Sequence, residues 1–147
     1  MRDELYRILA APKELDRRIR IRAEKYQEIL LTMIPGAIRY DQDRVQTSPE
    51  DKMLAAIANA DTEYRAMKKL ERQKAKKIRE ITNLVIAALD DQIEREIILG
   101  RYCGLLKWEK VAEEQGITES VLFKARRSAL HKLDIFISSS TQYLDKI

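Results

Sequence analysis

Apolar residues recur at alternating steps of three and four along two long segments of this chain. The first stripe comprises Leu15, Ile19, Tyr26, Ile29 or Leu30, and Met33, with an interruption at Arg22. The second comprises Met53, Ile57, Ala60, Tyr64, Met67, Leu70, Ala75, Ile78, Ile81 and Val85. Such a spacing of 3.5 residues is what two helices need to supercoil around each other. We therefore predict two long helices that fold back antiparallel.

Prolines and glycines indicate where these helices begin and end. Pro12 suits the first turn of a helix that runs to about Met33, after a short separate helix over residues 3–10. Pro35-Gly36 should stop this helix, and residues 37–48 read as irregular. Ser48 is the expected N-cap of the second helix, with Pro49 at its first position.

The two predicted helices differ in length. A helix from Pro49 to about Leu89 would be on the order of 60 Å long, nearly twice the first. Part of its apolar stripe must therefore find another partner, which could be the C-terminal region, the short N-terminal helix or a second copy of the chain. We expect a homodimer, because an uncovered apolar stripe in water tends to find a partner.

The C-terminal third has the spacing of a helix-turn-helix. Ala112 is a small residue that would let two helices pass closely, and Gly116 would supply the positive φ of a sharp turn. Leu122 follows six residues later and would fasten the second helix to the core. The single Trp108 is expected to bury its ring behind the second helix.

The polar residues of this second helix are candidates for reading DNA. Apolar residues at helical spacing should pack inward, namely Ile117, Leu122, Ala125, Ala129, Leu130 and Leu133. The predicted DNA-binding residues are eight of the remaining side chains: Thr118, Glu119, Ser120, Phe123, Lys124, Arg126, Arg127 and Lys132. Thr118 is expected chiefly to cap the helix. For each of the others a purely structural role remains an alternative to base contact.

The same region resembles region 4 of bacterial sigma factors. The matching segments are residues 89–104, where an acidic stretch precedes an apolar run and Arg101-Tyr102, then Trp108 to Ala112, Gly116-Ile117-Thr118, and residues 128–133. A long helical N-terminal half before such a module is similar to short phage and prophage late regulators of the ArpU/RinA type. The resemblance implies double-stranded DNA and RNA polymerase as partners. Lys107 departs from the family, which places Ser or Thr at that capping position.

Basic residues gather in the second long helix. Residues 65–80 hold eight Lys or Arg against two Glu, a local balance of +6 that exceeds the +4 of the whole chain. Lys68, Lys69, Arg72 and Lys76, together with Lys107, are candidate phosphate contacts, since neutralised phosphates release counterions. A solvated outer face of a coiled coil is the alternative interpretation.

Composition excludes several other classes of protein. The chain has 147 residues, of which 35% are charged, and few Gly, Pro, Thr or Val, so strands have little support. No run of eighteen apolar residues exists, so we expect a cytoplasmic protein without a membrane span. The lone Cys103 has no disulfide partner and should belong to the core, and with His131 as the only histidine we expect no metal or other cofactor. Neither a Gly-rich phosphate loop nor a nucleophile elbow is present, so we do not expect an enzyme.

The sequence therefore predicts an all-α fold: an N-terminal antiparallel long-helix hairpin over residues 1–86, a helix-turn-helix domain over residues 87–137, and a tail over residues 138–147. The expected function is sequence-specific regulation of transcription, in activation of phage or prophage late genes with RNA polymerase. The alternatives are a small terminase subunit that adapts DNA for packaging, and a protein that binds RNA polymerase alone. A ring of eight or more subunits would favour packaging.

Overall fold

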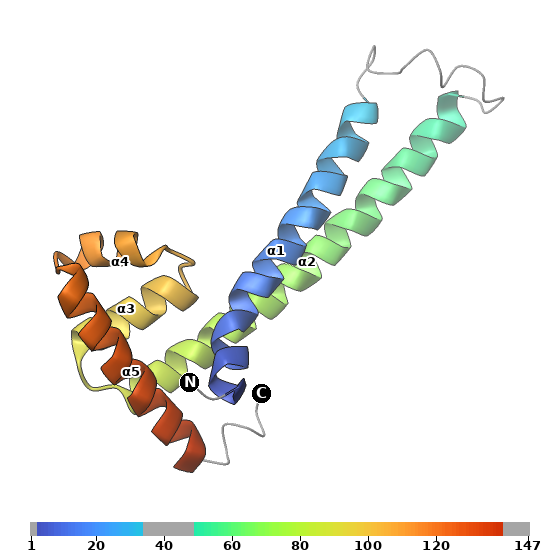
Figure 1. Cartoon of the computed structure of the whole chain (residues 1–147). Helices are drawn as coiled ribbons and strands as arrows, with labels where there is room; N and C mark the ends of the chain where they lie inside the picture. The colour runs from blue at the N-terminus through green and yellow to red at the C-terminus, as the bar shows by residue number, and fades with distance from the viewer. Residues whose placement is uncertain (1–2, 34–48, 140–147) are drawn as a thin grey trace. The chain divides into compact units, whose positions relative to one another are not determined.

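The computed structural model describes residues 3–33 and 49–139 (Figure 1). Within these residues the chain forms five α-helices and no strand. The helices are α1 (Asp3–Thr32), α2 (Pro49–Ala88), α3 (Gln92–Tyr102), α4 (Trp108–Gln115) and α5 (Glu119–Ser139). The prediction of an all-α fold is confirmed. The predicted stop at Pro35-Gly36, the cap at Ser48 and most of the predicted tail lie outside the described residues.

The chain divides into two compact units. Unit 2 is residues 15–72, and unit 1 joins residues 1–14 to residues 73–147. The first turns of α1 and the last turns of α2 therefore belong with α3, α4 and α5, whereas the sequence placed a boundary at residue 86. The reason is hydrophobic: Leu5 and Leu9 of α1 share one buried cluster with Leu84 of α2.

Helix α1 runs without a break through Pro12, so the prediction of a separate short helix over residues 3–10 is wrong. A proline inside a helix removes one backbone hydrogen bond and costs about 3 kcal/mol. Here Leu5, Ile8, Leu9 and Pro12 are all buried on one face of the helix. Each buried side chain of this size contributes about 1.5–3 kcal/mol, which together exceeds the cost of the proline.

The junction between α2 and α3 is held by two capping residues. Arg95 donates from Nε to the carbonyl of Leu89 and from Nη2 to the carbonyl of Ile86, where the helix leaves acceptors unpaired. Asp91 is the N-cap of α3, and its carboxylate accepts from the amides of Ile93 at 2.8 Å and Glu94 at 3.2 Å. These contacts fix where α2 ends, within one residue of the predicted position.

Unit 1 has a continuous apolar core to which every helix contributes. Its buried members are Leu5, Ile8, Leu9, Ile81, Leu84, Val85, Leu89, Ile97, Ile98, Val111, Ala112, Leu122, Ala129, Leu133 and Ile137. Cys103 is half-buried and packs against this cluster. The core fixes α4 and α5 on a rigid base, which matters for the surface that α5 presents.

Unit 2 consists of the α1 and α2 segments within residues 15–72, which lie side by side and run antiparallel (Figure 1). Arg22 explains the interruption in the first apolar stripe, because its Nη1 donates to both carboxylate oxygens of Glu63, at 3.0 and 3.2 Å. The rings of Tyr26 and Tyr64 also meet, with centroids 5.8 Å apart. Among the described residues of unit 2, Ala60 is the only buried apolar side chain.

Candidate nucleic-acid interface

The turn between α4 and α5 depends on glycine at position 116. Gly116 adopts φ 63° and ψ 33°, the left-handed region that the sequence predicted. Its amide donates to the carbonyl of Glu113 at 3.2 Å, and the amide of Ile117 donates to that of Ala112 at 3.1 Å. This pair of bonds is a Schellman motif, which ends a helix and satisfies its last carbonyls.

Three residues around the turn have the local roles that the sequence predicted. Ala112 and Leu122 are both buried in the core of unit 1. Thr118 caps α5, because its Oγ1 accepts from the amide of Val121 at 3.3 Å. Lys107 is the N-cap of α4 and makes no capping bond with its side chain, so its ammonium group stays exposed.

The first turns of α5 expose a stripe of side chains with varied chemistry. Its members are Glu119, Ser120, Phe123, Lys124 and Arg127, which we call the α5 stripe. Their spacing of one, three, one and three residues places them on a single face of the helix. The opposite face is buried through Leu122, Ala129 and Leu133. Five of the predicted DNA-binding residues therefore share one surface.

Arg126 was predicted as a DNA contact, but it lies against Trp108. Its guanidinium carbon is 4.7 Å from the centroid of the indole ring, and that of Arg101 is 5.5 Å from it. Tyr102 meets the same ring edge to face at 6.0 Å. Burial raises the pKa of Tyr102, although the charges of Arg126 and Arg101 act in the opposite direction. The indole is half-buried beside α5, so its predicted packing role fits the geometry.

Lys132 was also predicted as a DNA contact, and its ammonium group is engaged within the protein. Its Nζ donates to both carboxylate oxygens of Glu94 in α3, at 3.0 and 3.2 Å. Glu94 is the only buried charged residue among the described residues. Sequence reasoning missed it, although its position three and four residues before Ile97 and Ile98 places it on the apolar face of α3.

These two contacts reduce the positive charge that α5 offers to a ligand. Lys124 and Arg127 remain exposed beside Glu119, whereas Arg126 and Lys132 have partners in unit 1. From the sequence alone, all four basic residues were expected to be available for DNA. The α5 stripe is thus a mixed surface of charge, hydroxyl and aromatic ring, which suits recognition of base edges more than bulk attraction to phosphates.

The candidate phosphate contacts in α2 divide into two kinds. Lys68 forms an ion pair with Glu71 at 3.2 Å, which raises the pKa of Lys68, and its Nζ lies 5.3 Å from the ring of Tyr64. Lys69, Arg72 and Lys76 are exposed. Their spacing of three and four residues gives them a common face of one helix. Lys68 is therefore the least available of the four.

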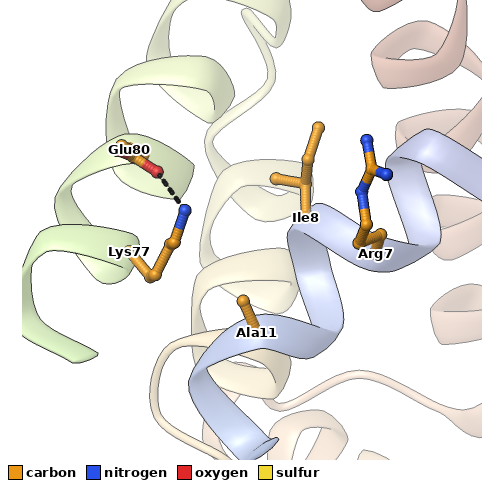
Figure 2. Close-up of a pocket in the computed structure, with 5 residues that line it drawn as sticks. All are labelled: Arg7, Ile8, Ala11, Lys77 and Glu80. Carbon is orange, nitrogen blue, oxygen red and sulfur yellow. Dashed lines mark ion pairs between the residues drawn. The ribbon is translucent and has the colours of Figure 1, made fainter. Parts of the chain in front are cut away.

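A hollow of about 190 Å³ lies in unit 1 between the N-terminal part of α1 and the C-terminal part of α2 (Figure 2). Ile8 and Ala11 face the ion pair of Lys77 and Glu80, whose charged atoms are 3.4 Å apart. The guanidinium group of Arg7 points away from that pair. The hollow is mostly apolar, and its facing charges neutralise each other, so it offers no reactive group.

Within residues 3–33 and 49–139, no three His, Cys, Asp or Glu side chains converge as metal ligands would. None of the helices described here is long and apolar enough to cross a membrane. Comparison with known proteins found no matching protein family, curated protein or solved structure.

Proposed function

We propose that the protein is a sequence-specific DNA-binding regulator of transcription, in which α4, the Gly116 turn and α5 act as a helix-turn-helix. The observation that carries this proposal is the α5 stripe. It lies on the first turns of a helix whose opposite face is locked into the core, directly after a tight turn. In a helix-turn-helix, the N-terminal residues of the second helix are the ones that contact base edges in the major groove.

Each member of the α5 stripe has a matching partner on a base pair. Arg127 or Lys124 would donate to O6 and N7 of guanine, and Glu119 would accept from N4 of cytosine. The ring of Phe123 is 45% exposed, which is a large apolar area to leave in water, and it would contact the methyl group of thymine. Ser120 could bond either a base or a phosphate.

The resemblance to sigma factor region 4 supports the finer parts of the proposal. These are action with RNA polymerase and activation of phage or prophage late genes. The proposed homodimer rests instead on the apolar stripe of α2 that α1 is too short to cover, and the proposed cytoplasmic location on the lack of a long apolar run in the sequence. The Schellman turn at Gly116 and the cap at Thr118 both fall in the segment that carries the resemblance. Lys107 would then sit beside the phosphate backbone at the start of α4.

Selection of bound fragments from genomic DNA, followed by gel-shift titration of the selected site, tests this function. Lys124→Ala and Arg127→Ala should each weaken specific binding by about 1–3 kcal/mol, the usual worth of a good bidentate contact. Lys13→Ala is the control, because Lys13 is also exposed but lies on α1, and its replacement should leave affinity unchanged. Absence of any selected site, or equal affinity in all three variants with intact circular dichroism, would contradict the proposal.

A further inference from the structure

Unit 2 leaves several apolar side chains about half-exposed along one side of α2. Met53, Leu54 and Ile57 are 50%, 65% and 51% exposed, and Tyr64 is 42% exposed. Met53, Ile57 and Tyr64 are separated by four and seven residues, so they lie on one face of the helix, with Leu54 beside them. The buried Ala60 lies on the same stripe, and the ring of Tyr64 meets that of Tyr26 in α1, so this face borders the contact between the two helices. We call these four residues the Met53–Tyr64 face.

This face is notable because the described part of unit 2 buries so little. Ala60 is its only buried apolar side chain, and the contact between Arg22 and Glu63 is polar. Burial of apolar area is the dominant favourable contribution to helix packing, and a full Leu or Ile contributes about 1.5–3 kcal/mol. Further burial on the Met53–Tyr64 face would therefore stabilise α2 appreciably.

The charges of α2 indicate which occupant fits. Residues 49–63 carry Glu50, Asp51, Asp61 and Glu63 against Lys52, a net charge of −3. Residues 64–72 carry Arg65, Lys68, Lys69 and Arg72 against Glu71, a net charge of +3. A second copy of α2 laid antiparallel places the acidic part of each helix against the basic part of the other. A parallel copy would place like charges together, which is unfavourable.

Ion pairs within one copy neutralise some of these charges but leave the pattern in place. Asp61 pairs with Arg65, Glu63 with Arg22 of α1, and Lys68 with Glu71, while Lys69 and Arg72 stay exposed in the basic segment and Glu50 in the acidic one. In an antiparallel pair, the two-fold axis passes through the midpoint of whatever segment pairs with itself. For the charged residues 50–51 and 69–72 this midpoint lies about two residues, or ~3 Å, along the helix from the midpoint of the Met53–Tyr64 face. One two-fold axis can therefore satisfy both the apolar contact and the charge pattern.

We propose that the Met53–Tyr64 face is the surface through which two copies of this chain associate, with α2 of one copy antiparallel to α2 of the other. The inference rests on the proposed function only in that it specifies how the homodimer forms. Mass is measured without DNA, so the dimer and the DNA-binding function can fail separately.

Sedimentation equilibrium of the full chain should give a dimer at micromolar concentration. Ile57→Glu should raise the dissociation constant of the dimer by about 100-fold, because each dimer would bury two unpaired carboxylates. Ala55→Glu is the matched control: it adds the same charge to an exposed position two residues away, on the opposite side of the helix, and should leave the mass unchanged. A monomer at every concentration, or an equal effect of both substitutions, would overturn the proposal.

Charge reversal tests the antiparallel orientation. Lys69→Glu with Arg72→Glu should weaken the dimer about tenfold, because residues 49–63 and residues 64–72 then both carry net negative charge. Adding Glu50→Lys and Asp51→Lys should recover part of the lost affinity, since residues 49–63 then carry a net charge of +1 and residues 64–72 carry −1, a reversed but again complementary pattern. Circular dichroism controls for loss of helix at the reversed terminus. Failure of the fourfold variant to recover, with helix content intact, would exclude this orientation, and a ring of subunits would exclude the two-fold surface.

Discussion

Replacing Lys132 with Met should destabilise unit 1 because it removes the partner of a buried carboxylate. Both oxygens of Glu94 accept from Lys132, and the Glu94 side chain is only 8% exposed. Methionine keeps the aliphatic stem of lysine and lacks the charge, so packing changes little. The carboxylate of Glu94 would then remain desolvated without compensation.

The magnitude follows from the exposure of the two partners. Breaking a fully buried pair from one side costs about 3–5 kcal/mol. The Lys132 side chain is 47% exposed, so water reaches the pair and we expect a smaller loss, about 1–2 kcal/mol. Glu94→Gln should cost less than Lys132→Met, because the ammonium group left behind can be solvated. The double variant Glu94→Leu/Lys132→Met should return close to wild-type stability, since it removes both charges.

Urea unfolding followed by the fluorescence of Trp108 measures these differences within unit 1, since the chain has one tryptophan. The free energy of unfolding should decrease in the order wild type, then Glu94→Gln, then Lys132→Met. An unchanged urea midpoint for Lys132→Met, together with weakened DNA binding, would refute it. That outcome would return Lys132 to the DNA contacts predicted from the sequence.

Three further predictions follow from single contacts. Replacing Lys69, Arg72 and Lys76 with Gln should flatten the slope of log K for DNA binding against log salt by about 0.9 per lost phosphate contact. Lys68→Gln should change this slope least. An unaltered slope would mean that these basic residues of α2 form a solvated helix face. Gly100→Ala should stabilise the fold by up to about 1 kcal/mol, because alanine favours a helix interior over glycine and Gly100 lies within α3. The added Cβ would fit, since its nearest neighbour is the side chain of Val111 at 3.6 Å. Gly116→Ala should cost about 1–2 kcal/mol of stability because residue 116 has a positive φ. Gly104→Ala should cost about 1–3 kcal/mol because its Cβ would lie 2.9 Å from the carbonyl oxygen of Gly100. Thermal unfolding should therefore show a raised melting temperature for the change at Gly100 and lowered ones for the other two, and any other pattern would contradict this. Burial raises the pKa of the Cys103 thiol, so iodoacetamide should react more slowly with the folded than with the urea-unfolded chain at neutral pH. Because the folded pKa is the higher one, the contribution of Cys103 to stability is present below pH about 8.5 and is lost as pH rises through the folded value.

Features set by local chemistry could be predicted from the sequence. The extent of α2 follows from its periodicity and from Pro49, and the turn at Gly116 follows from the conformations that only glycine adopts readily. The cap at Thr118 belongs to the same kind, because a hydroxyl directly before a helix finds an unpaired amide within three residues. Each of these signals lies within a few residues of the structure it determines.

Features set by distant partners could not be predicted in this way. Lys132 pairs with a residue 38 positions earlier, and Arg126 lies on the ring of Trp108, so neither partner is visible in the pattern of α5 itself. Pro12 is a similar case, because burial of its face of α1 outweighs the local preference of proline for a helix start. Helical periodicity can place a basic residue on the outward face of its helix, and its charged group can still pair with a residue of a neighbouring helix.

The contacts that remain on α5 bear on why association of two chains would matter for DNA binding. With Arg126 and Lys132 engaged elsewhere, Lys124 and Arg127 are the exposed bases of the α5 stripe, and each good base contact is worth about 1–3 kcal/mol. Two such contacts supply about 2–6 kcal/mol of discrimination, near the lower part of the roughly 4–10 kcal/mol that separates specific from non-specific binding. Two copies double the number of base contacts and require two correctly spaced half-sites. If the DNA-binding function holds, Ile57→Glu should therefore reduce specific affinity far more than non-specific affinity, although Ile57 lies in unit 2 and far along the chain from α5.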